Sequence, residues 1–117
     1  MTISGGTATV SGCYFDATPD ESKAAQALTK GISLKESAVV TIENTTIVGV
    51  TCASADWASA GVEVATNVTA TVTGCNITTN TSGQVYGVAV QGGQLGMTNT
   101  QRTAEVTISN STITANE

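Results

Sequence analysis

The most closely spaced acidic side chains, Asp16, Asp20 and Glu21, are the first candidates for chemistry. Several neighbouring carboxylates can hold a hard cation such as Ca²⁺, and a carboxylate pair can act in sugar hydrolysis. Asp20 and Glu21 also suit the first turn of a helix, where negative charge complements the helix dipole. We favour the helix interpretation and assign no catalytic, cofactor-binding or metal-binding residue.

The basic side chains do not form a catalytic set. Lys23, Lys30 and Lys35 lie in or beside one segment, whereas Arg102 is far along the chain. Such side chains could abstract a proton or hold a uronate only if they converged on one substrate, so we expect them to keep the surface soluble. A net charge of −5 with only four basic residues argues against nucleic acid as a partner.

The three cysteines, Cys13, Cys52 and Cys75, occur in a chain without histidine or a Cys-x-x-Cys pair, which argues against a zinc site. Cys13 and Cys75 occupy equivalent places in the repeat described below. Two layers at about 4.8 Å each would separate them by about 9.6 Å, beyond the roughly 7 Å reach of a disulfide. We expect both to be small buried residues, with pairing to Cys52 as the less favoured alternative.

Asparagine and threonine suggest two further activities. Glycosylation would use the Asn-x-Ser/Thr triplets, which begin at Asn44, Asn67, Asn76, Asn80 and Asn110. Ice binding would use rows of threonine on an outer face, such as Thr41, Thr71 and Thr107. A threonine-rich composition produces such triplets by chance, and Glu43 and Glu105 interrupt the polar face. Strand propensity explains the threonines well.

Composition favours one all-β domain over residues 1–117. Aromatic residues make up 3% of the chain and charged residues 11%, against roughly 25% charged in an average domain. No run of 18 apolar residues is present, so no membrane insertion is expected. The start MTISGG lacks the basic and apolar parts of a signal peptide. We expect the chain to be a fragment of a longer repeat array.

A repeated phrase is the strongest feature of the sequence. Four segments align without gaps: TVSGCYF at 9–15, TIENTTI at 41–47, TVTGCNI at 71–77 and TISNSTI at 107–113. In each, an inward aliphatic residue is followed two positions later by Gly or Asn, which tolerate the left-handed backbone of a sharp bend. A small residue and then, two positions later, a large apolar residue should turn inward after the bend. These positions should form rows along a stack of layers.

A second phrase, GISL at 31–34, GVEV at 61–64 and GVAV at 87–90, has the alternation of a strand with one buried face. The distance from this phrase to the next bend is constant in the first two repeats and longer in the third. The added residues lie in QGGQLGMTNTQ at 91–101, which we predict to be a surface loop. A constant motif with variable connections is typical of a solenoid.

The connections between the two phrases differ. A short helix is predicted over about 19–28, with Thr18 as N-cap, Pro19 in the first turn, Glu21 completing a capping box and Gly31 as the stop. We expect it to cover the side or the open end of the stack. The connection at 51–60 would hold one helical turn with Trp57 as a plug, and the one at 79–86 would be a plain turn.

The phrase hydrophobic-Thr-Ile-x-Asn-small-x-Ile resembles the coil signature of right-handed parallel β-helices. This is the pectin-lyase-like superfamily, which includes polysaccharide lyases, phage tailspikes and bacterial surface adhesins. The resemblance implies an all-β, right-handed parallel β-helix solenoid of about three to four coils, with a short helix in the first-coil loop. The catalytic Asp, Arg, Lys or His sets of the enzymes in that superfamily have no counterpart in this sequence.

The resemblance implies a non-catalytic, secreted, bacterial cell-surface segment of adhesin type, acting as a stalk or a loop-presenting scaffold. Recognition of a glycan or host surface protein would fall to the loops Ala17–Lys30, Cys52–Ala60 and Gln91–Arg102. Two alternatives stay open: a fragment of a carbohydrate-active enzyme, either a polysaccharide lyase or a glycoside hydrolase, and a self-assembling filament subunit. The last follows from open end layers, whose strand edges favour end-to-end self-association.

Overall fold

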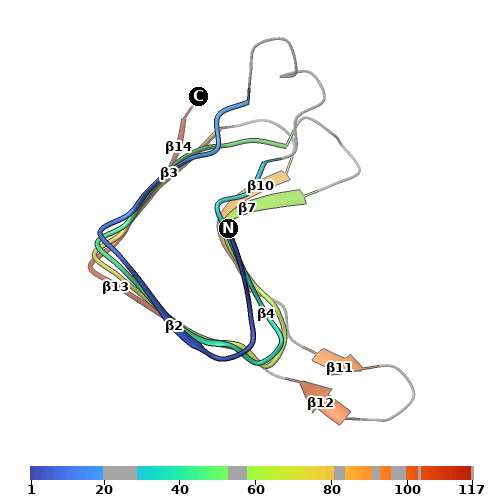
Figure 1. Cartoon of the computed structure of the whole chain (residues 1–117). Coiled ribbons are helices and arrows are strands. Elements are labelled where there is room, and N and C mark those ends of the chain that lie inside the picture. The colour runs from blue at the N-terminus through green and yellow to red at the C-terminus, as the bar shows by residue number, and fades with distance from the viewer. Residues whose placement is uncertain are drawn as a thin grey trace.

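The computed structural model describes residues 1–19, 29–52, 58–80, 84–90, 93–95, 100–102 and 104–116. Every regular element in this part of the chain is a β-strand. Three parallel sheets of four strands each form the sides of a prism, and a two-stranded antiparallel hairpin projects from one corner (Figure 1). The architecture is therefore that of a β-helix-like solenoid, as the repeat predicts.

The chain visits the three sheets in turn, so each pass adds one strand to every sheet. The first sheet contains β1 (Thr2–Ser4), β4 (Ile32–Lys35), β7 (Ala58–Val64) and β10 (Gln84–Val90). The second contains β2 (Thr7–Ser11), β5 (Val39–Glu43), β8 (Thr69–Thr73) and β13 (Glu105–Ser109). The third contains β3 (Tyr14–Asp16), β6 (Thr46–Val50), β9 (Asn76–Asn80) and β14 (Thr112–Asn116). We call each pass a layer, numbered from the N-terminus.

The strand register confirms the alignment of the repeated phrase. Val10, Ile42, Val72 and Ile108 are successive partners across the second sheet. The same holds for the large apolar residues after the bend, which pair in the third sheet in the order Phe15, Ile47, Ile77 and Ile113. All of these pairs are parallel, so the phrases lie directly above one another, and aliphatic side chains of neighbouring layers bury each other.

The predicted bends are also confirmed. Gly12, Asn44, Gly74 and Asn110 have φ angles of 64°, 50°, 63° and 51°, all in the left-handed region that Gly adopts freely and Asn tolerates best. Each bend separates a strand of the second sheet from a strand of the third. One residue per layer therefore sets the angle between two sides of the prism.

The corner between the first and second sheets contains left-handed residues that the sequence did not suggest. Gly5 and Gly6 in layer 1 have φ angles of 70° and 69°, and Glu36 and Ser37 in layer 2 have 56° and 61°. Asn67, with φ of 67°, occupies this corner in layer 3. Layer 2 thus places two consecutive side-chain-bearing residues in a conformation that disfavours a Cβ atom.

The glycine that opens each GISL-type phrase is required by packing rather than by its backbone angle. A Cβ atom on Gly61 would lie 2.6 Å from Cγ2 of Ile77 and 2.8 Å from the carbonyl oxygen of Gly87. A Cβ on Gly31 would meet Ile47 of its own layer and the Gly61 carbonyl, and one on Gly87 would meet Ile113. This glycine column allows the first sheet to approach the isoleucine row of the third.

The small residues after the bends are buried only inside the stack. Thr45 and Cys75 are buried, whereas Cys13 is exposed and Ser111 half-buried. The prediction that Cys13 is a buried small residue is therefore wrong, because among the described residues layer 1 packs against a layer on one side only. Cys13 and Cys75 carry free thiols, in agreement with the predicted separation, and Cys52 is buried.

The predicted loops differ in outcome. Residues 91–101, predicted to be a surface loop, include most of an antiparallel hairpin formed by β11 (Gly93–Leu95) and β12 (Thr100–Arg102). The helix predicted over 19–28 lies, beyond residue 19, outside the described residues. Trp57 and the middle of the connection at 79–86 lie outside them as well.

Candidate functional site

The variable connections leave the prism at two different corners. The loops Ala17–Lys30 and Cys52–Ala60 both join the third sheet to the first, one layer apart. The loop Gln91–Arg102 joins the first sheet to the second, and Figure 1 shows its hairpin β11–β12 projecting well away from the corner between β3 and β7. We call the corner between the third and first sheets the loop-bearing corner and treat it as the candidate site.

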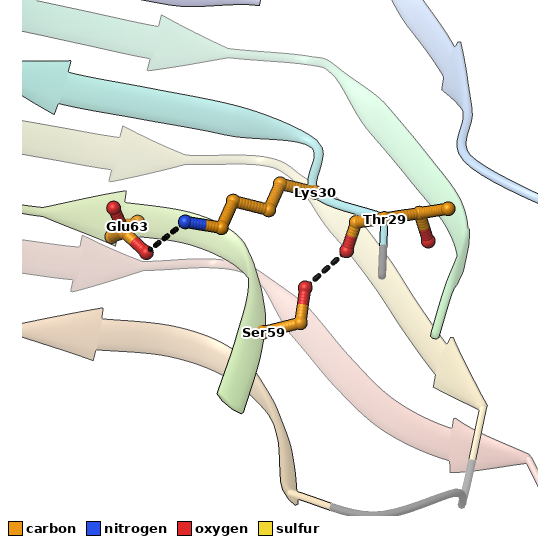
Figure 2. A network of polar contacts seen from close by, with 4 residues as sticks. All are labelled: Thr29, Lys30, Ser59 and Glu63. Carbon is orange, nitrogen blue, oxygen red and sulfur yellow. Dashed lines mark hydrogen bonds and ion pairs between the residues drawn. The ribbon is translucent and has the colours of Figure 1, made fainter. Parts of the chain in front are cut away.

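A hydrogen-bonded clamp holds the ends of both loops at this corner. The Thr29 amide donates to the Thr51 carbonyl at 2.8 Å, and the Thr51 amide donates to Thr29 Oγ1 at 2.8 Å. The hydroxyl of Ser59 donates to the Thr29 carbonyl, as Figure 2 shows. Thr51 and Ser59 are both buried. The end of the first loop is thereby tied to the start and the end of the second.

The start of the first loop is fixed by a close backbone approach. A Cβ on Gly49 would lie 2.6 Å from the backbone nitrogen of Thr18, and the φ angle of 76° at Gly49 also favours glycine. The Ala17 amide donates to the Val48 carbonyl at 2.8 Å. The first loop therefore leaves layer 1 in contact with β6 of layer 2.

Asp16, a member of the predicted acidic group, lies at the end of β3 and is exposed. Its Oδ1 accepts the Thr18 amide at 3.0 Å. Hydrogen bonding from the Thr18 side chain, and then from its backbone, lowers the pKa of Asp16 because both favour the carboxylate. The other two members, Asp20 and Glu21, lie outside the described residues.

Lys30 forms an ion pair that crosses from the first loop to layer 3. Its Nζ lies 2.9 Å from Oε2 of Glu63 on β7, and both side chains are partly exposed (Figure 2). A surface pair of this kind contributes about 0–1 kcal/mol. The charge of Lys30 is thus engaged by the scaffold, although the sequence suggested only a solubilising role.

The basic residues that the structure describes do not converge. Lys30 lies just before β4 and Lys35 is its last residue, so about five residues of mostly extended chain, roughly 16 Å, separate them. Arg102 is on the hairpin at another corner, and Lys23 lies outside the described residues. In the described ranges no group of three or more His, Cys, Asp or Glu residues could hold a metal ion. The described part of the corner offers polar side chains and backbone groups.

The clamp has a weak signal in the sequence. Thr29, Thr51 and Ser59 stand where a loop meets a strand, but hydroxyl residues are frequent throughout the chain.

Comparisons with protein-family models, curated proteins and solved structures each found no match. A search of the described residues for a helix that could span a membrane found none.

Proposed function

We propose that this protein is a non-catalytic segment of an extracellular bacterial surface protein of adhesin type, acting as a scaffold that presents loops. The observation that carries the proposal is the loop-bearing corner. Two variable loops emerge there one layer apart, with their ends held by the clamp of Thr29, Thr51 and Ser59. Rigid ends reduce the entropy that a loop loses when it binds a ligand.

We further assign the fold to right-handed parallel β-helices of the pectin-lyase-like kind. The right-handed sense is supported by the chain direction in Figure 1, where the ribbon turns clockwise from β2 to β3 as it recedes from the blue N-terminal layer. Connections between parallel strands of one sheet are right-handed in about 98% of cases. The family assignment is supported by the four aligned bends at Gly12, Asn44, Gly74 and Asn110.

The ligand of this scaffold is a glycan or a host surface protein. The segments 20–28 and 53–57 supply carboxylates, hydroxyls, an amide and one aromatic side chain, Trp57, to the loops of this corner. Aromatic side chains combined with a few polar groups are the usual lining of a small-molecule site. The described ends of the two loops are joined by hydrogen bonds, so both loops leave the prism at neighbouring points.

The test is a glycan array and a panel of host surface proteins, screened with and without Ca²⁺. Two variants replace residues 20–28 or 53–57 with a short Gly-Asn linker, and a matched control replaces residues 96–99 between β11 and β12. We expect each corner variant to lose at least tenfold in affinity while the control binds as wild type, with unchanged circular dichroism. Absence of any ligand, or loss of binding in the control alone, contradicts the proposal. Turnover of a polysaccharide would favour the enzyme alternative.

A further inference from the structure

The outer face of the third sheet exposes an aromatic side chain. Tyr14 on β3 is 67% exposed, the highest value among the described large apolar and aromatic residues. The next residue, Phe15, packs against the core. Because successive side chains of a strand point to opposite faces, the Tyr14 ring lies on the outer face whichever layers stack above or below it. Such a ring can stack on an apolar surface of a ligand and still offer its hydroxyl.

Tyr14 belongs to a row of polar side chains that crosses all four strands of this sheet. It pairs with Thr46, which pairs with Asn76, which in turn pairs with Thr112. Asn76 and Thr112 are exposed and Thr46 is half-buried. Neighbouring parallel strands lie about 4.8 Å apart, so the row is about 14 Å long. A row of this length exceeds one sugar ring and can contact several units of a chain-like ligand.

The side chains of this row have hydrogen-bonding groups that the scaffold does not use. Among the described residues, no hydrogen bond to another group of the protein is found for the side chains of Tyr14, Thr46, Asn76 and Thr112. An amide and a hydroxyl can each donate and accept. Asp16, on the same face of β3 as Tyr14, adds an exposed carboxylate. The row can therefore exchange its hydrogen bonds with water for hydrogen bonds with ligand hydroxyls.

The fold does not dictate the residue types of this row. All four residues occupy the same position of the repeated phrase, between the small residue and the large apolar residue. Those two neighbours keep their character in every layer because they pack inside the prism. The position between them varies, and holds an aromatic ring, an amide and two hydroxyls. It is therefore free to serve binding without a cost to the stacking of layers.

The chemistry of this face fits an uncharged glycan. The strands β3, β6, β9 and β14 contain one charged residue, Asp16, and no basic residue, so a nucleic acid or another anionic ligand would find no counter-charge. A protein partner needs an apolar centre to its interface, whereas the described outward side chains are mostly hydroxyls and amides, with Tyr14 and Val48 as the apolar contacts. A sugar chain combines apolar C–H faces with many hydroxyls and matches both kinds of group.

We propose that the outer face of the third sheet, along the row from Tyr14 to Thr112, is a binding surface for an uncharged oligosaccharide. The Tyr14 ring stacks on the C–H face of one sugar unit, and the Asn76 amide bonds to hydroxyls further along the chain. Tyrosine supplies a large contact area at a low cost in conformational entropy, and asparagine supplies adaptable hydrogen bonding. The surface contains neither residues 20–28 nor residues 53–57, so this inference is separate from the ligand proposed for the loop-bearing corner.

The test measures the binding of neutral hexasaccharides of glucose, N-acetylglucosamine or mannose by isothermal titration calorimetry. Tyr14→Ala removes the ring and Asn76→Ala removes the amide, and each should weaken binding by roughly tenfold. Tyr14→Phe keeps the ring and should bind nearly as wild type. The matched control Tyr86→Ala removes a tyrosine of the first sheet that is 49% exposed, and should leave the affinity unchanged.

The outcomes separate this surface from the loop-bearing corner. Circular dichroism checks that each variant is folded, and Asn76→Ala keeps the test decisive if Tyr14→Ala does not fold. Binding that depends on Tyr14 and Asn76 but not on residues 20–28 or 53–57 supports the proposal. No binding of any of the three hexasaccharides to wild type, or an equal loss in Tyr86→Ala, would overturn it. Binding that is lost only when residues 20–28 or 53–57 are replaced assigns the glycan to the loop-bearing corner and overturns this inference alone.

Discussion

Gly61 offers the sharpest test of how the layers pack. Replacing it with alanine adds a methyl group 2.6 Å from Cγ2 of Ile77 and 2.8 Å from the carbonyl oxygen of Gly87. Neither neighbour can withdraw easily, because Ile77 is fully buried and the Gly87 carbonyl belongs to the backbone of β10. The substitution should therefore strain the corner where the third sheet meets the first.

The size of the effect follows from two opposing terms. Overpacking a well-packed core costs about 1–3 kcal/mol, and a backbone contact puts Gly61→Ala near the upper end of that range. Restricting the unfolded chain by replacing glycine returns about 0.4–1 kcal/mol. The net loss in the free energy of unfolding should be about 2 kcal/mol, which lowers Tm by roughly 6–12 °C in a domain of this size.

The measurement is urea and thermal unfolding followed by circular dichroism, with two comparisons. Gly12→Ala meets no heavy atom within 4 Å, so only the φ of 64° opposes it, at about 1–2 kcal/mol. Ile77→Leu in the Gly61→Ala background removes the branched methyl from Cβ and should recover part of the loss. If Gly61→Ala were as stable as wild type, or Ile77→Leu gave no recovery, the packing explanation of the glycine column would be refuted.

Two further predictions concern hydrogen bonds that the structure describes. Thr45 Oγ1 donates to the Glu43 carbonyl at 3.0 Å and accepts a hydrogen bond from the Cys13 amide at 3.4 Å. Thr45→Val should therefore lower the free energy of unfolding by about 1–2 kcal/mol, measured by chemical denaturation. The control Thr46→Val, on the outer face, should be nearly neutral. The lowered pKa of Asp16 means that its carboxylate stabilises the fold above the unfolded pKa of about 3.9, and that this contribution is lost as pH falls through the lower folded pKa. The stability difference between wild type and Asp16→Asn should therefore be largest near neutral pH and shrink below about pH 4, and a difference that grew on acidification would contradict this assignment.

The sequence predicted the stacking register because the relevant signals are local. Alternation of apolar and polar residues decides which face of a strand is buried, and a shift by one residue would invert every side chain. Gly or Asn at the bend then fixes where one strand ends and the next begins. These two signals align Val10 with Ile42, Val72 and Ile108, as the strand pairing confirms.

Burial and corner packing could not be predicted in the same way. Cys13 and Cys75 occupy equivalent positions in the repeat, yet one is exposed and the other buried, because burial depends on having a layer on both sides. The column of Gly31, Gly61 and Gly87 is required by isoleucines of the third sheet, and that contact exists only once three sheets have closed into a prism. Spacing along the chain does not reveal either fact.

The segments of the candidate site differ from those of the scaffold in whether their sequence repeats. Repeated residues form the ladders, whereas the segments expected to bind a ligand are the ones that do not repeat. At the loop-bearing corner the clamp of Thr29, Thr51 and Ser59 satisfies backbone groups at the loop ends with partners from the scaffold. We therefore expect substitutions within residues 20–28 or 53–57 to leave the hydrogen bonds between the strands intact. The binding surface can then change without a change of fold.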